Sequence, residues 1–148
     1  MNKRIIKRML WYFSFALYLG LLIYFLLFAE MFDRDMAYRR YSYNLEPFRE
    51  IVRFIRYRHK LGMTAVVLNL AGNITVFIPF GIFVPVLFKP DMRLWQIVFS
   101  TMAASLVIEI LQLVFRVGSF DVDDILLNTL GGLIGACIYR IGRMRNGD

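Results

Sequence analysis

Residues 109–132, EILQLVFRVGSFDVDDILLNTLGG, decide how this chain is interpreted. The stretch places Glu109 and Gln112 inside an apolar run, passes through Arg116 and an aspartate-rich turn, and returns to apolar sequence at Asn128. A charged side chain at the middle of a membrane helix costs about 2.5–3.5 kcal/mol on the insertion scale. Ionisable residues in such a run therefore indicate a functional site within a membrane.

The composition of the whole chain agrees with a membrane location. Of its 148 residues, 59% are apolar and 16% aromatic, which is too apolar for an ordinary soluble domain. Apolar segments long enough, or nearly long enough, to cross about 30 Å of hydrocarbon lie at 10–28, 63–88, 94–115 and 125–141, the last of which can begin at Phe120. The first segment is too long for a signal-peptide core, so we expect it to remain as an anchor. The sequence predicts one all-α domain over residues 1–148, a bundle of four transmembrane helices in the cell membrane.

Basic residues near the first segment suggest its orientation. Lys3, Arg4, Lys7 and Arg8 precede it, and such a cluster usually stays in the cytoplasm. With this cluster counted, the two sides of the membrane carry equal numbers of basic residues, so the first helix, which usually dominates orientation, sets the expectation. We expect both termini in the cytoplasm, with the loops 31–62 and 116–124 outside.

The loop between the first two segments contains an amphipathic pattern. Phe48, Ile51, Val52 and Ile55 recur at helical spacing, and charged residues occupy the rest of the wheel. The pattern predicts a helix lying in the membrane interface. Two interpretations remain open: a connector with a solvated charged face, or a helix whose arginines bind lipid phosphates.

The polar residues of the later segments each have a structural explanation. Asn69 and Asn73 lie on one face of the second segment, above kinks expected at Pro79 and Pro85, and asparagines between membrane helices often serve packing alone. Asp121 and Asp124 fit the N-cap and the acidic first turn of a helix.

Their depth nevertheless favours a common site. At 1.5 Å per residue, Glu109 lies about 9 Å, Asn128 about 5 Å and Asn73 about 15 Å inside helix ends that share one side of the membrane. Polar groups from three segments thus converge in one leaflet, which predicts a polar ligand cavity in the outer leaflet.

The remaining motifs limit partners and cofactors. Gly131 and Gly135 form a GxxxG that allows close approach of another helix, either within the chain or in a homo-oligomer. A single Cys137 and a single His59 provide neither a disulfide nor metal-ligand spacing, so we expect no metal and no cofactor. The net charge of +7 fits anionic lipid headgroups better than nucleic acid.

Several of these residues together resemble the VanZ-like family. The resemblance covers residues 44–135 and rests on Asn44-Leu45-Glu46-Pro47-Phe48, then Asn73, Phe77, Pro79 and Gly81, then Glu109, Gln112, Arg116, Asp121, Asp124 and Asn128 with the glycines that follow. The resemblance implies a small polytopic protein of the cell envelope, connected with teicoplanin resistance and without an established reaction. Glu46 departs from the apolar residue often found at that position of the family.

Two functions compete most directly on this evidence, beside a purely structural assembly surface and, less favoured, transport. The first is a binding protein without catalytic activity, whose ligand is a lipid-linked cell-wall precursor or a lipoglycopeptide and whose candidate ligand-binding residues are Asn44, Asn73, Glu109, Gln112, Arg116, Asp121, Asp124 and Asn128. The second is an intramembrane enzyme acting on a polyprenyl phosphate, with Glu109, Asp121 and Asp124 as candidate catalytic residues. The absence of a nucleophile with an adjacent base favours the binding protein.

Overall fold

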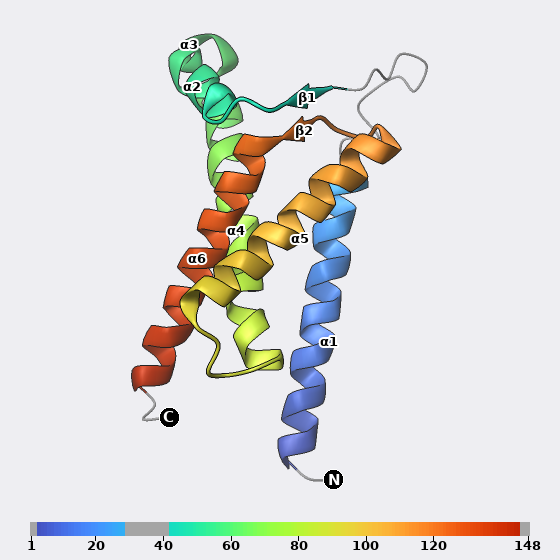
Figure 1. The fold of residues 1–148 in the computed structure, drawn as a ribbon, viewed down its shortest axis with the longest axis vertical. Helices are drawn as coiled ribbons and strands as arrows, with labels where there is room; N and C mark the ends of the chain where they lie inside the picture. Colours follow the sequence, from blue (N-terminus) through green and yellow to red (C-terminus); the bar gives the residue numbers. More distant parts are fainter. Residues whose placement is uncertain (1–2, 29–41, 146–148) are drawn as a thin grey trace.

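A computed structural model describes residues 3–28 and 42–145, and the structural statements below concern these residues. The long helices are α1 (Lys3–Ile23), α4 (Met63–Leu87), α5 (Leu94–Phe115) and α6 (Val122–Arg145), with a π-helical turn η1 (Tyr24–Phe28) after α1 (Figure 1). All four long helices have the length and apolar composition needed to cross a membrane. This confirms the predicted all-α membrane bundle. The part of the first loop at 31–41 lies outside the described residues.

The helix ends differ from the predicted span ends in two places. The helix α1 begins at Lys3 rather than at residue 10, and α6, which begins at Val122, two residues after the earliest predicted start at Phe120, continues to Arg145 rather than ending at residue 141. Hydropathy detects the apolar part of a helix, whereas the backbone hydrogen bonds continue into charged flanking turns. The predicted second and third spans agree with α4 and α5 within one residue.

Aromatic side chains hold α1 against α4. The rings of Trp11 and Phe83 meet edge to face with centroids 5.6 Å apart, and Phe15 lies 5.4 Å from the same Phe83 ring. Tyr18 Oη donates a hydrogen bond of 2.8 Å to the carbonyl of Val76. These contacts give α1 a specific register on the bundle, because each ring needs its own place along α4.

Glycines bring α4 and α6 together. A Cβ atom on Gly131 would lie 2.0 Å from the carbonyl oxygen of Ile74, and one on Gly135 would lie 2.1 Å from that of Ile78. Only glycine allows backbones to approach so closely. The GxxxG therefore has a partner within the chain, and a homo-oligomer through the same two glycines stays a prediction.

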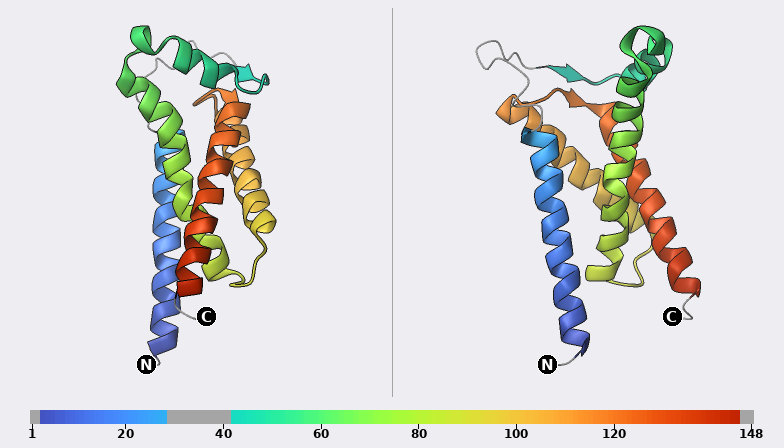
Figure 2. Two further views of the ribbon diagram at one scale, coloured as in Figure 1. Left: turned by 90° about the vertical axis from the view of Figure 1, so that its left-hand side faces the viewer. Right: turned by 180° about the vertical axis from the view of Figure 1, so that it is seen from behind.

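The end of the bundle away from both termini carries the shorter elements (Figures 1 and 2). There α2 (Arg49–Arg56) and α3 (Arg58–Leu61) precede α4, and β1 (Tyr43–Asn44) pairs in parallel with β2 (Phe120–Asp121). The helix α2 is the predicted amphipathic helix, and it lies across the end of α4 in Figure 2. The spacing of three residues predicts ion pairs on this helix, and they form between Arg49 and Glu46 at 3.6 Å and between Arg53 and Glu50 at 2.8 Å.

Candidate functional site

Asp121 joins the two loops at this end of the bundle. As the residue before α6, it accepts a hydrogen bond of 2.8 Å from the amide of Asp123, which is the N-cap geometry that the sequence predicts. The same oxygen accepts a hydrogen bond of 3.0 Å from Asn44 Nδ2, and Asn44 Oδ1 accepts one of 3.2 Å from the amide of Glu46. Asn44 is thus oriented by its own turn and bonded to the start of α6.

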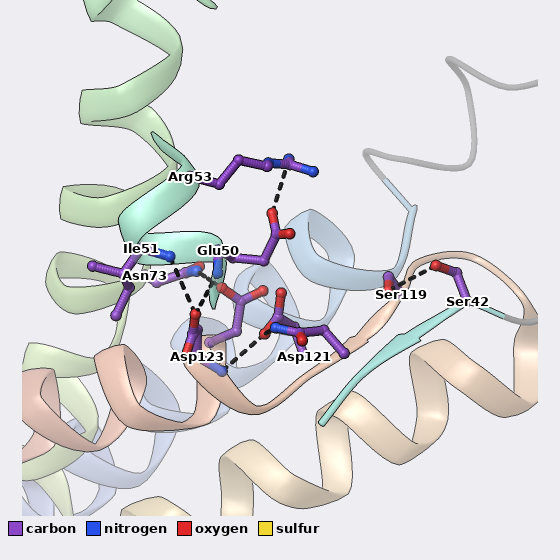
Figure 3. A network of polar contacts seen from close by, with 10 residues as sticks. Ser42, Glu50, Ile51, Arg53, Asn73, Ser119, Asp121 and Asp123 are labelled. Atoms are coloured by element: carbon purple, nitrogen blue, oxygen red, sulfur yellow. Dashed lines mark hydrogen bonds and ion pairs between the residues drawn. The ribbon is translucent and has the colours of Figure 1, made fainter. Parts of the chain in front are cut away.

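Asp123 connects α6 to α2, a role that the sequence analysis missed. Its side chain is only 1% exposed, and its carboxylate accepts hydrogen bonds from the amides of Phe48, Glu50 and Ile51, the last two at 2.8 and 3.1 Å (Figure 3). These amides belong to the first turn of α2 and the residue before it, which have no partner inside the helix. Asp123 therefore caps α2 from a different part of the chain.

The turn that leads into α2 holds an unusual backbone conformation. The amide of Arg49 donates 3.3 Å to the carbonyl of Glu46, with Pro47 and Phe48 between them and Phe48 at φ 68°, ψ 1°. This is a type II turn, whose third position normally takes glycine or asparagine. A phenylalanine in this conformation is strained, and the bond from its amide to Asp123 helps to hold it there.

Glu109 and Asn73 bond to the same turn from the bundle side. Glu109 is 2% exposed, and its Oε2 accepts a hydrogen bond of 2.9 Å from the backbone amide of Asp121. Asn73 Nδ2 donates a short hydrogen bond to Asp124 Oδ1. The residues before α2, the helices α4 and α5 and the start of α6 therefore meet through side chains on or around Asp121, Asp123 and Asp124.

Two further buried amide side chains lie on α5 and α6. Gln112 Nε2 donates 2.9 Å to the carbonyl of Leu26 in η1, and Asn128 Nδ2 donates 2.8 Å to Ser105 Oγ. Gln112 and Asn128 are 8% and 2% exposed, yet within the described part of the chain Gln112 Oε1 and Asn128 Oδ1 have no hydrogen-bond partner. Buried amide oxygens of this kind usually have a partner, so these two need an explanation.

The spacing of Glu109, Gln112 and Arg116, at i, i+3 and i+7, predicts one polar stripe along a helix, and Arg116 departs from this stripe. The helix α5 ends at Phe115, and Arg116 adopts a left-handed conformation with φ 54° and ψ 34°. The amides of Val117 and Arg116 donate to the carbonyls of Gln112 and Leu113 at 3.0 and 3.2 Å, which is the Schellman pattern. Because of this turn, Arg116 is exposed while Gln112 is buried.

The surroundings of Asp121 change its acidity. Burial raises the pKa of its carboxyl above the usual 3.8, and the hydrogen bonds from the Asp123 amide and from Asn44 oppose part of that increase. No group of three or more His, Cys, Asp or Glu within the described ranges is arranged to hold a metal ion. The arrangement provides hydrogen-bond donors and acceptors and an exposed guanidinium.

The structure thus brings together most of the residues that the sequence selected. Asn44, Glu109 and Asp121 form one chain of bonds, Asn73 meets Asp124, and Asn128 and Gln112 make separate buried bonds to Ser105 and to the carbonyl of Leu26. Asp123 and Ser105 were missed. A signal for Asp123 existed, since α2 begins after Pro47 and Phe48 with no capping side chain of its own, and an uncapped helix start implies a cap from elsewhere.

Comparison with known proteins now identifies the family. Residues 15–143 match the family model described as VanZ/LLP1. The chain belongs to the VanZ/LLP1 family. It is also 32% identical over 126 residues to Protein VanZ of Enterococcus faecium, with 84% of this chain and 70% of that protein covered. No solved structure matches the chain.

Two sequence blocks that carry the resemblance to the VanZ-like family take part in the hydrogen-bond network. Block Asn44–Phe48 and block Asp121–Asp124 lie more than 70 residues apart in sequence, and two hydrogen bonds described above connect them. The two blocks form one structural unit at the end of a multi-pass membrane bundle.

Proposed function

We propose that this VanZ/LLP1 protein binds a lipid-linked cell-wall precursor or a lipoglycopeptide at the polar end of its bundle, and that it thereby lowers susceptibility to teicoplanin-type antibiotics. The teicoplanin connection comes from the family resemblance. The polar end faces outwards in this proposal, with both termini cytoplasmic. Figure 1 shows the start of α1 and the end of α6 at one end of the bundle, and α2, β1 and β2, which belong to the polar network, at the other. This arrangement supports placing the termini and the network on opposite sides of the membrane.

One observation carries the binding proposal: Gln112 Oε1 and Asn128 Oδ1 are buried without a partner in the described chain. Leaving a buried acceptor unsatisfied costs about 1–3 kcal/mol. Water molecules can donate to these oxygens in the ligand-free protein, and a donor from the ligand takes their place in the bound protein. Either donor removes that cost. Hydroxyl and amide groups, which sugars and peptides provide, are suitable donors.

Cationic groups near the same end fit the anionic part of such a ligand. Arg116 is exposed, and a hollow of about 400 Å³ on α2 is lined by Arg49, Arg53 and Arg56 together with Phe48 and Val52. Arginine pairs with phosphate and carboxylate through two parallel hydrogen bonds. The Asp123 cap holds this helix in place above the network.

The enzymatic alternative is not proposed. Its candidate catalytic groups Glu109 and Asp121 accept hydrogen bonds from backbone amides that define the turn. These contacts give both carboxylates a structural use, and none of the described contacts favours turnover.

The experiment removes one of the two buried acceptors, Asn128 Oδ1, by a change that should leave the fold intact. In the double variant Ser105→Ala, Asn128→Leu both partners of one buried bond become apolar, a change that is close to neutral for stability. We expect native mass spectrometry to show that the co-purifying ligand of the wild type is lost, and we expect teicoplanin susceptibility to rise to the level of a deletion strain. Thermal stability in detergent should stay within about 1 kcal/mol.

Thr101→Val is the matched control. Thr101 is fully buried on α5, the helix of Ser105, and among the described residues its hydroxyl bonds only to the Ile97 carbonyl of its own helix. This variant should keep both ligand and resistance. A double variant that binds and protects like the wild type would contradict the proposal, as would equal losses in the Thr101→Val protein.

A further inference from the structure

We infer a second site, at the opposite end of the bundle, that binds an anionic glycerophospholipid. A groove of about 830 Å³ lies there between α1, α4 and α6, the end at which both termini emerge (Figure 2). Its rim includes Lys7, Arg8 and Arg143, and its walls include Trp11, Val86 and Ile138. This site is separate from the polar network and does not depend on the proposed function.

The rim of the groove is positively charged. Arg8 lies against Tyr12, 5.7 Å from the ring centroid, and Arg143 Nη1 reaches the Asp91 carboxylate at 2.8 Å. Asp91 is 73% exposed at its side chain, and such exposed pairs contribute little energy. Three cations against this one carboxylate leave a charge of about +2 to attract an anion.

The position of the charges matches the shape of a phospholipid. Along α1, Lys7 lies four residues, or about 6 Å, nearer the helix start than Trp11. Along α6, Arg143 lies five residues, or about 7.5 Å, nearer the helix end than Ile138. On both helices the cations therefore lie towards the water and the apolar side chains towards the membrane centre.

This order selects a lipid over a free anion. A phosphate at the rim would pair with Lys7, Arg8 and Arg143, and an acyl chain below it would cover Trp11, Val86 and Ile138. A soluble phosphate would leave that apolar wall uncovered. Phospholipid with a net negative headgroup satisfies both halves of the groove.

The first test removes the charges. The full chain is purified in detergent and titrated with phosphatidylglycerol or phosphatidylcholine, and bound lipid is counted by native mass spectrometry. We expect Lys7→Gln, Arg8→Gln, Arg143→Gln to weaken phosphatidylglycerol binding about tenfold, which is the usual effect of losing about 1.4 kcal/mol. The matched control is Lys3→Gln, Lys89→Gln, Arg145→Gln, exposed cations that do not line the groove.

The second test blocks the groove and keeps every charge. Gly142 lines the groove, and a Cβ atom there meets nothing within 4 Å, so Gly142→Leu fills the space without a backbone clash. Gly20→Leu on α1 has the same freedom and serves as its control. We expect Gly142→Leu to lose phosphatidylglycerol and Gly20→Leu to retain it.

Three results would overturn the inference. The first is equal loss in the two triple variants, which would indicate general charge attraction. The second is full binding by Gly142→Leu, which would place the lipid elsewhere. The third is displacement of phosphatidylglycerol by glycerol 3-phosphate at similar concentration, which would indicate a site for a soluble anion.

Discussion

Arg116 occupies a backbone conformation that glycine adopts more easily. Its φ of 54° costs an L-residue about 1–2 kcal/mol relative to the right-handed conformation. We predict that Arg116→Gly keeps or slightly raises thermal stability in detergent but loses ligand binding and teicoplanin protection, because the guanidinium is removed. Arg116→Lys keeps the charge but loses the bidentate geometry of the guanidinium, so its ligand binding should lie between those of the wild type and Arg116→Gly. An Arg116→Gly protein with full activity would show that the guanidinium has no part in ligand binding.

Asp121 predicts a specific pH dependence. Because burial raises the pKa of its carboxyl above 3.8, the folded protein holds this proton more tightly than the unfolded chain, and this group adds stability as pH falls through the raised pKa. Asp121→Asn keeps the acceptor for Asn44 and Asp123 and has no such titration.

We therefore expect Asp121→Asn to be more stable than the wild type near neutral pH, with a difference that shrinks as the pH approaches 3.8. Melting curves of the two proteins at several pH values measure this difference. Parallel curves at every pH would mean that the carboxyl is not desolvated in the fold.

At the scale of elements, the position of α2 depends on one carboxylate from α6. Asp123→Asn replaces an ionised acceptor of three amide bonds with a single carbonyl and an NH₂ that faces donors. Each lost bond to a charged group costs about 1.5–3 kcal/mol. We predict a lower melting temperature and much faster hydrogen exchange at the Glu50 and Ile51 amides. Glu46→Gln, at an exposed side chain, should change neither, and unchanged exchange in Asp123→Asn would refute the cap.

The contact of α4 with α6 gives a second prediction for elements. A Cβ atom on Gly81 would lie 2.1 Å from the carbonyl oxygen of Gly132, so Gly81→Ala must push the two backbones apart. We expect a loss of at least about 1–3 kcal/mol, the usual cost of overpacking a core. Gly72→Ala on the same helix has open space and should gain up to about 1 kcal/mol from helix propensity. Similar melting temperatures for the two variants would contradict this packing.

At the scale of the whole molecule, the two ends of the bundle are chemically different. Figure 1 shows α2, β1 and β2 at one end and the start of α1 and the end of α6 at the other. The first end carries the buried network, and the second carries the basic groove. Such polarity suits a protein whose ends meet different solutions across a membrane.

The orientation itself is tested by cysteine labelling. In a Cys137→Ser background, Ser119→Cys should react with a maleimide that cannot cross the membrane of intact cells, and Asp91→Cys should react only after the cells are opened. This follows from the basic residues in the first two turns of α1 and in the last turn of α6. The reverse pattern would place the polar network on the cytoplasmic side.

The sequence alone determined the features that depend on neighbouring residues. Four apolar segments predict α1, α4, α5 and α6, because a helix satisfies its own backbone in lipid. Asp121 as an N-cap and the pairs of α2 also follow from short spacings, since their partners lie two or three residues away.

Only the tertiary structure decided which of the polar residues meet. The Asn44 bond to Asp121 spans 77 residues and the Phe48 bond to Asp123 spans 75, and such contacts depend on how the helices pack rather than on local spacing. Packing also turned Gly131 and Gly135 towards α4 and left Arg116 outside the buried stripe. Asp123 looked like one more acidic residue of a helix start, because the helix it caps begins far away in sequence and is brought to it only by the fold.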